Sequence, residues 1–418
     1  MHIDKSKILL GNKALWTIYI VLIAISMIEV YSSSGKSIMT PQGNYIALLA
    51  KQFILILAGV GGCFVCSKIS YKKLTRAIVS LLWGISLACL FAVLISGRMS
   101  GDSAARWIDL GIFQFQPSEL AKYTLMLMLA QQMAFAQNEL DSKKLYWTLL
   151  IEITITSGLI FFDNFSTAAL IFISGFILMF IGGVNRRLWT YTFLLLIVAA
   201  ILFVFLTKVA PDFIALFPRG TTWVNRINNY GTGDITDMTQ QNEALTAIAT
   251  GGFIGRGIGN TIQSRFLDEG QNDFIFAIIL EEGGIWLCLI ILILYICLMY
   301  NLIKVANNCG GYFGTLTTYG FAIIIGLQSI INMSVSVGLM PVTGQTLPFI
   351  SYGGTSFVLA SMYLGMVINI SKYDKKTTKQ TIDSKQDAAT DVEEQQKQDL
   401  LKAANNNIEK EDNNESNN

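Results

Sequence analysis

Charged residues are scarce in this chain. Asp, Glu, Lys and Arg make up 14% of its 418 residues, whereas hydrophobic residues make up 52% and the mean hydropathy is +0.50. Soluble globular proteins contain about 25% charged residues. An apolar excess of this size is more than one core can bury, so it predicts that much of the surface faces lipid. The formal net charge of +1 gives no general attraction to nucleic acid, and we expect no nucleic-acid partner.

Several motifs of soluble enzymes are also missing. His2 is the only histidine, so no histidine cluster with metal-ligand spacing occurs, and neither a phosphate-binding Gly-Lys loop nor a dinucleotide fingerprint is present. Cys63 and Cys66 have the spacing of a redox pair but lack a βαβ context, and we predict no disulfide framework. No cleavage-site pattern follows the first apolar segment, residues 16–26, which predicts a retained membrane anchor.

Ten apolar stretches are long enough to cross a bilayer, whose hydrocarbon core of about 30 Å needs roughly 20 helical residues. A polar break at Asp163 and Asn164 separates the fifth stretch from the sixth, and we interpret it as a tight turn. The predicted fold class is an all-α polytopic membrane protein with ten transmembrane helices. The stretches are centred near Val21, Leu57, Ala88, Met128, Ile155, Ile173, Ile197, Cys288, Ile325 and Leu364.

Lys and Arg residues determine the predicted orientation. With the N-terminus inside, the inner loops contain most of them, and the short outer loops contain only Lys36, Lys51, Arg98 and Arg106. Positive residues accumulate on the cytoplasmic side of membrane proteins, so both termini are predicted to be cytoplasmic. Residues 1–372 form the predicted membrane domain. Residues 373–418, which are rich in polar and charged side chains, form a predicted disordered cytoplasmic tail.

A large outer loop, from about residue 210 to residue 273, connects the seventh and eighth predicted spans. It contains apolar runs of its own, and Gly251, Gly252, Gly255, Gly257 and Gly259 follow within nine residues. Long loops of this kind are usually functional. We expect short helices on the membrane surface and a glycine-rich bend that allows close backbone approach.

Ionisable residues at the membrane edge are costly and are therefore candidates for function. One group surrounds the start of the fourth span, with Arg106 and Trp107 at the interface and Pro117 in the first helical turn. Glu119 and Lys122 follow on one helical face, where they can form an ion pair. Two interpretations stay open: an interfacial anchor with a structural ion pair, or a substrate-binding site.

A second group lies at the outer mouth of the eighth span, where Glu269 and Asp273 stand near each other and Asp273 directly precedes an apolar run. Desolvation at such a rim should raise the pKa of a carboxyl group, which suits a general base. The nearby Arg256 could hold an anionic leaving group. A helix N-cap explains Asp273 equally well. Glu281 and Glu282 are predicted about two turns deeper in this span, facing protein or water.

A third group is the sequence GLMPVTGQTLPFISYGGTS, residues 338–356, which interrupts an apolar region with two prolines and four glycines. Broken backbone at membrane depth is tolerated only where it lines a cavity or packs against protein. Tyr352 is the one titratable side chain in this segment. We therefore predict that the segment forms a substrate cradle and does not perform the chemistry.

The three groups, in this order on a ten-span scaffold, resemble the SEDS family of shape, elongation, division and sporulation proteins. The last segment is the most specific match, since the family pattern GLLPxxGxxLPFxSYGGSS appears here as GLMPVTGQTLPFISYGGTS. The family's RWI…QPSE…K block matches between Arg106 and Lys122. Its GGxxGxGxGN and DFIFAxxxEExG blocks match from Gly251 to Asn260 and from Asp273 to Gly284.

The resemblance implies a peptidoglycan glycosyltransferase that polymerises lipid II at the outer face of the bacterial cytoplasmic membrane. It implies that Asp273 is the catalytic general base for the 4-hydroxyl of the acceptor sugar, and that undecaprenyl pyrophosphate leaves with inversion. A divalent cation, Mg²⁺ or Mn²⁺, is an expected cofactor. The predicted substrate-binding residues are Arg106, Trp107, Gln116, Ser118, Glu119, Lys122, Arg226, Arg256, Glu269 and Ser351.

The last motif and the long tail are more similar to division-type than to elongation-type members. The implied partners are lipid II, undecaprenyl-pyrophosphate-linked glycan, a class B penicillin-binding protein and other division proteins at the septum. Asn164 stands where the family often has Asp, so no essential carboxylate is expected at position 164. In a second departure, the family's LPEAHTD appears here as LDEGQND, which keeps Glu269 and Asp273. The alternative functions are a lipid II flippase, an elongation-specific polymerase, and a scaffold for the penicillin-binding protein.

Overall fold

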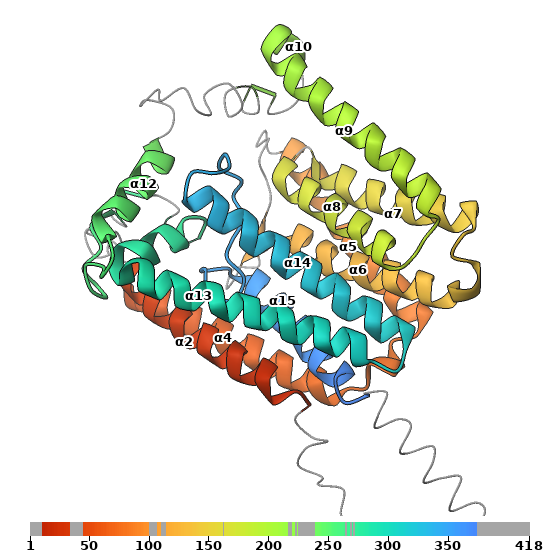
Figure 1. Ribbon diagram of the computed structural model, residues 1–418, viewed down its shortest axis with the longest axis horizontal. Coiled ribbons are helices and arrows are strands. Elements are labelled where there is room, and N and C mark those ends of the chain that lie inside the picture. The colour runs from red at the N-terminus through yellow and green to blue at the C-terminus, as the bar shows by residue number, and fades with distance from the viewer. Residues whose placement is uncertain are drawn as a thin grey trace, which may run out of the picture.

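The structure is a computed structural model in which the described residues form a bundle of long, mostly apolar helices (Figure 1). A short antiparallel pair, β1 (Ile108–Asp109) with β2 (Gln114–Phe115), precedes one of these helices. The predicted tail falls, apart from Tyr373, outside the described residues. The structure describes residues 11–33, 45–99, 107–109, 114–161, 163–215, 220–221, 224, 239–263, 266–267, 270 and 272–373.

Each of the ten predicted apolar stretches is helical. Among the described residues, seven helices are long and apolar enough to cross a membrane, namely α2, α4, α5, α7, α9, α13 and α14. Two more, α8 and α15, are apolar but shorter. The chain is therefore a helical, multi-pass membrane protein. The helix bounds are α2 (Lys13–Ser33), α4 (Tyr45–Lys68), α5 (Arg76–Met99), α6 (Pro117–Phe135), α7 (Lys143–Phe161), α8 (Phe165–Ile181), α9 (Arg186–Val209), α13 (Ile275–Asn308), α14 (Tyr312–Ser336) and α15 (Thr355–Ile370), with short elements η1 (Tyr71–Lys73), η2 (Gln137–Glu139), α10 (Pro211–Ala215) and α12 (Thr239–Gly251) between them.

The helix α6 forms the middle of the bundle. Nearly all of its side chains are buried, and it packs against α5, α8, α14 and α15. In contrast, α9 lies at the edge of the bundle in Figure 1 and exposes most of its apolar side chains. A helix that is apolar on all sides and exposed on most of them is typical of contact with lipid.

The last helix, α15, packs closely against α4 and is hydrogen-bonded to α2. Gly365 allows α15 to approach α4, because a Cβ at this position would lie 2.2 Å from the carbonyl oxygen of Cys63. The hydroxyl of Tyr19 on α2 donates a hydrogen bond to Ser361 Oγ on α15 at 2.7 Å. Small residues at helix contacts and interhelical hydrogen bonds are the usual means of packing helices in lipid.

The tight turn predicted between α7 and α8 is confirmed. The backbone N–H groups of Asp163 and Asn164 both donate to the carbonyl oxygen of Ile160. The side chain of Asn164 accepts a hydrogen bond from the backbone N–H of Thr167 at 3.1 Å and so caps α8. An asparagine is as good a helix cap as an aspartate, which gives Asn164 a structural role that needs no negative charge.

The helix α13 is broken near its beginning. Gly284 has φ +61° and ψ −164°, so residues 275–283 form one helical segment and residues 285–308 another. The second segment is about 36 Å long at 1.5 Å per residue, enough to cross the hydrocarbon core. The prediction that Glu281 and Glu282 lie about two turns into the eighth span, facing protein or water, is confirmed. They end the first segment, and both are buried in protein.

The glycine-rich bend after α12 contacts this break, and the close backbone approach predicted for the bend occurs here. The backbone N–H of Arg256 donates to the carbonyl oxygen of Glu281, and that of Gly257 donates to the carbonyl oxygen of Glu282, each at 2.9 Å. Gly255 has φ +82°, and a Cβ there would lie 2.1 Å from the carbonyl oxygen of Glu282. A side chain at position 255 would therefore push the loop away from α13.

Candidate functional site

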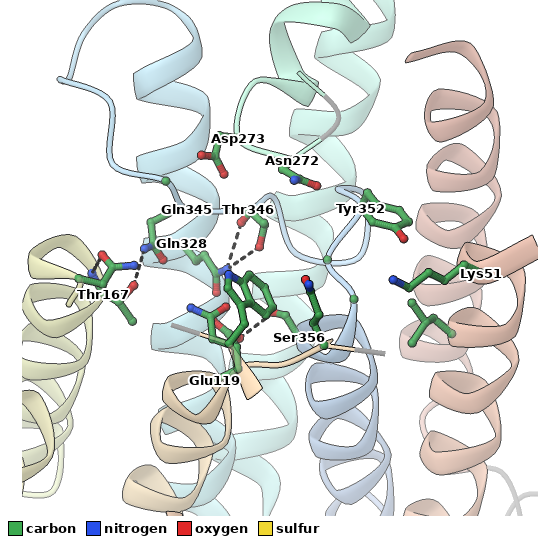
Figure 2. A pocket seen from close by; sticks show the side chains of 18 residues that line it. Lys51, Glu119, Thr167, Asn272, Asp273, Gln328, Gln345, Thr346, Tyr352 and Ser356 are labelled. Atoms are coloured by element: carbon green, nitrogen blue, oxygen red, sulfur yellow. Dashed lines mark hydrogen bonds between the residues drawn. The ribbon is translucent and has the colours of Figure 1, made fainter. Parts of the chain in front are cut away.

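A cavity of about 310 Å³ lies at one end of the bundle, where α4, α6, α8, α13, α14 and α15 meet (Figure 2). Most of its lining side chains are polar, which is unusual for space inside a membrane bundle and is typical of a site that binds a polar group. The lining residues are Lys51, Leu55, Trp107, Gln114, Gln116, Glu119, Asn164, Thr167, Asn272, Asp273, Gln328, Gly344, Gln345, Thr346, Tyr352, Gly353, Gly354 and Ser356.

Asp273 lies at the rim of this cavity, in the turn before α13 (Figure 2). The next residue, Phe274, is fully buried and occupies the N-cap position, and the helix begins at Ile275. A helix N-cap is the alternative role that the sequence left open for Asp273, but Asp273 lies one residue before the N-cap position. Its side chain is half-buried, so the carboxylate stands where apolar protein meets the polar cavity.

Asn332 of α14 fixes the backbone of this turn. Its side-chain Nδ2 donates to the carbonyl oxygen of Asp273 at 2.8 Å and to that of Gln345 at 2.7 Å. The same amide thus joins the turn before α13 to the last loop. Gly344 in that loop has φ +70°, and a Cβ there would lie 3.5 Å from Asp273 Oδ2. The loop backbone can therefore run close to the carboxylate.

Ser351 makes a second connection between the last loop and this turn. Its Oγ donates to the carbonyl oxygen of Asn272 at 2.7 Å and accepts from the backbone N–H of Leu347 at 2.7 Å. Residues 338–354 are irregular, as predicted, and they both pack against protein and line the cavity. Ser351 itself is buried and is not among the residues that line this cavity, so it shapes the cradle by holding the backbone.

The predicted ion pair between Glu119 and Lys122 is confirmed. Lys122 Nζ lies 2.8 Å from Glu119 Oε2 and donates to Gln328 Oε1 at 3.1 Å. Ser356 Oγ donates to the same Glu119 oxygen at 2.6 Å. Lys122 is fully buried and does not line the cavity, whereas Glu119 does. Lys122 therefore balances the charge of Glu119 from behind the cavity wall.

The other predicted site residues are distributed unevenly. Trp107 and Gln116 line the cavity together with Glu119 and Asp273. Ser118 instead borders a small neighbouring cavity with Asp163 and Asn164. Arg256 is outside the cavity lining, and its guanidinium lies 3.8 Å from a carboxylate oxygen of Glu281. The predicted residues Arg106, Arg226 and Glu269 lie outside the described part of the chain.

The carboxylate of Glu281, to which the sequence assigned no functional role, anchors the glycine-rich loop. It accepts hydrogen bonds from the hydroxyl of Thr261 and from the backbone N–H of Ile262, the latter at 2.9 Å. Glu282 accepts a hydrogen bond from the hydroxyl of Ser32 on α2. Arg256 lies beside Glu281 and outside the cavity lining. The sequence-based expectation that it holds an anionic leaving group is therefore not supported by its position in the structure.

Four functional candidates were absent from the predicted site: Lys51, Gln328, Asn332 and Gln345. Gln328 and Asn332 are spaced four residues apart in an apolar helix, a pattern that places two amides on one face. Lys51 lies at the start of an apolar span, and a cation in that position is a further signal. The hydrogen-bond partners of the three amide side chains are distant in sequence, so these sequence signals did not assign the amides to the site.

Tyr352 faces the cavity from the last loop (Figure 2). Burial raises the pKa of its phenol above the ordinary value of 10.0, so the hydroxyl stays protonated at neutral pH and can donate a hydrogen bond. Within the described residues, no group of three His, Cys, Asp or Glu side chains could hold a metal ion. The predicted divalent cation would need ligands from substrate or from acids such as Glu269 that are not described.

Comparison with known proteins gives a consistent result. The family model for FtsW, RodA and SpoVE, described as "cell cycle protein", matches residues 12–376. A protein of Coxiella burnetii named "Probable peptidoglycan glycosyltransferase FtsW" is 30% identical over 84% of this chain and 93% of its own length. The stage V sporulation protein E of Bacillus subtilis is 31% identical over 86% of this chain and 96% of its own length.

Solved structures show the same fold. A chain from the structure titled "Structural coordination of polymerization and crosslinking by a peptidoglycan synthase complex" is 26% identical, with a TM-score of 0.67, over 87% of this chain and 98% of that one. The rod shape determining protein RodA of Thermus thermophilus is 23% identical, with a TM-score of 0.60 and the same coverage. The chain therefore belongs to the SEDS family of cell cycle proteins, and its relatives place it on the FtsW-like side of that family.

Proposed function

We propose that this protein is a peptidoglycan glycosyltransferase that polymerises lipid II during cell division, with Asp273 as its general base. The observation that supports this most directly is the half-buried Asp273 at the rim of a polar cavity inside a membrane bundle. Several relatives are named probable peptidoglycan glycosyltransferase FtsW, which gives the reaction class.

In the proposed reaction, the carboxylate of Asp273 takes the proton from the 4-hydroxyl of the acceptor sugar. The hydroxyl oxygen forms a bond to the anomeric carbon of the donor. The bond from that carbon to the diphosphate oxygen breaks, and undecaprenyl diphosphate leaves from the opposite face with both electrons. General-base catalysis typically contributes about 10²–10⁴-fold. Asn332 and Ser351 support this role because they hold the backbone on both sides of the carboxylate.

The proposed orientation places the cavity at the outer face. Ten spans with both termini in the cytoplasm, and the large outer loop between α9 and α13, agree with the distribution of Lys and Arg. Lipid II in the outer leaflet could then enter the cavity from the membrane. We further propose a class B penicillin-binding protein as partner, a location at the division septum, and Mg²⁺ or Mn²⁺ to help neutralise the diphosphate.

The test is polymerisation of lipid II by the purified full-length protein in liposomes, with glycan strands measured on a gel. Asp273→Asn preserves size and removes the base, so the initial rate should fall at least about 100-fold. Asp141→Asn is the matched control, because Asp141 is exposed in the turn before α7, and it should polymerise at the wild-type rate.

The same liposomes separate polymerisation from transport. Movement of lipid II across the bilayer that is equal in wild type and Asp273→Asn, without any glycan product, would contradict the proposed function and indicate a flippase. Normal growth of cells that contain Asp273→Asn as their only copy would indicate a scaffold.

A further inference from the structure

Within the part of the chain that the structure describes, one cation lines the cavity. Among the described lining residues, the charged side chains are Lys51, Glu119 and Asp273. The charge of Glu119 is balanced by Lys122, which is fully buried behind the wall. Lys51 is therefore the lining cation in the described part of the chain, and the ion pairs found there do not include it.

Lys51 is placed where an apolar span begins. The candidate span on α4 runs from Ala50 to Lys68, so Lys51 lies at the end of the helix that the proposed orientation puts outside. Its helical neighbours Phe53 and Ile54 are exposed as lipid-facing residues would be, whereas Gln52 is buried. A lysine within an apolar span is costly unless it reaches water or an anion. Figure 2 shows its side chain entering the cavity from α4, on the side away from α8.

We propose that Lys51 binds the diphosphate of the lipid-linked donor. The diphosphate is the leaving group of the proposed reaction and carries concentrated negative charge. A lysine ammonium binds phosphate oxygens through charge-assisted hydrogen bonds. The location of Lys51 next to lipid fits an anion that carries a polyprenyl chain, because the chain can stay in the membrane while the headgroup lies in the cavity. This assignment rests on the proposed function.

Neutral hydrogen-bond donors line the same cavity as Lys51. Tyr352 and the amide side chains of Gln114 and Gln116 line the same cavity. These groups can hydrogen-bond phosphate oxygens without adding charge, so Lys51 supplies the positive charge on this side. Arg256, the sequence-based candidate for this role, is held by Glu281 outside the lining.

The test measures binding without turnover. Undecaprenyl diphosphate, undecaprenol and inorganic pyrophosphate are titrated into the full-length protein in nanodiscs, and affinity is followed by a change in tryptophan fluorescence or by calorimetry. Lys51→Gln should weaken binding of undecaprenyl diphosphate at least tenfold and leave undecaprenol unchanged. Lys51→Arg should keep the affinity within a few-fold, because the charge is retained.

Lys68→Gln is the matched control. Lys68 lies at the opposite end of α4, with its Nζ 4.1 Å from the ring centroid of Phe64, and its removal should not change diphosphate binding. Wild-type affinity of Lys51→Gln for undecaprenyl diphosphate would overturn the proposal, as would an equal loss for undecaprenol. Inorganic pyrophosphate that binds as tightly as the lipid would overturn the assignment to a lipid-linked donor.

The failure of this proposal can be distinguished from failure of the proposed function. Asp273→Asn should bind undecaprenyl diphosphate within a few-fold of wild type, because the base is not part of the anion site. If Asp273→Asn still forms glycan, the general base is wrong whatever Lys51 does. If Asp273→Asn is inactive and Lys51→Gln binds and polymerises normally, only the anion site is wrong. In polymerisation assays, Lys51→Gln should raise KM for lipid II more than it lowers kcat.

Discussion

Charged residues at the cavity fall into two groups. Glu119 and Lys122 form a buried ion pair, whereas Lys51 and Asp273 line the cavity. Lys122 is fully enclosed and has both Glu119 and Gln328 as partners. Removing one member of a buried ion pair leaves the other charge without compensation, whereas removing both leaves no charge to desolvate. The stability of this region therefore depends on the pair as a unit.

Lys122→Met should lower the free energy of unfolding by about 3–5 kcal/mol, because the carboxylate of Glu119 then lacks its counter-ion. The double variant Glu119→Gln with Lys122→Met should regain most of that loss. Chemical denaturation in detergent, followed by tryptophan fluorescence, measures both. Lys73→Met, an exposed lysine in η1, should change stability by no more than about 0.5 kcal/mol. Equal losses in the single and double variants would show that packing, not charge, dominates.

Between elements, small residues decide how closely the helices approach. Gly365 on α15 lies against the backbone of α4 at Cys63, while Gly61 on α4 faces open space. The sequence contains both glycines and predicts both helices, but it does not distinguish these two positions. The distinction arises from which face of α4 meets α15, and that depends on packing across the whole bundle.

Gly365→Ala should destabilise the protein by about 1–3 kcal/mol, because the added methyl group forces α15 away from α4. Gly61→Ala should be neutral or raise stability by up to about 1 kcal/mol, because alanine favours the helix and meets no neighbour. The difference in melting temperature between the two variants, measured in the same detergent, checks this. Equal melting temperatures for the Gly365→Ala and Gly61→Ala variants would contradict the close packing of α4 and α15.

For the whole molecule, the proposed orientation puts the cavity and the glycine-rich bend outside. This can be tested with single cysteines in a variant whose six native cysteines are replaced. Ile258→Cys, exposed in the bend, should react with a membrane-impermeant maleimide in intact spheroplasts. Asp141→Cys before α7 and Lys372→Cys after α15 should react only after permeabilisation. Labelling of residue 372 from outside would exclude an even number of spans with the N-terminus inside.

The sequence by itself determined the local features of this protein. Hydropathy predicted the helices, helical spacing predicted the pair between Glu119 and Lys122, and glycines and prolines predicted the broken last loop. These properties depend on residues within a few positions of one another, so they can be predicted from the local sequence. The family resemblance added Asp273 as the proposed general base, and Asp273 lines the cavity in the structure.

Only the tertiary structure decided which distant residues share the cavity. It placed Lys51 of α4 on the same cavity as Asp273, put Arg256 beside Glu281, and joined Asp273 to the last loop through Asn332. It also showed that Gly284 interrupts α13, so that Glu281 and Glu282 end the first of its two helical segments and are buried in protein. Such contacts depend on helix neighbours and on long-range hydrogen bonds between buried polar groups, and neither follows from the periodicity of one segment.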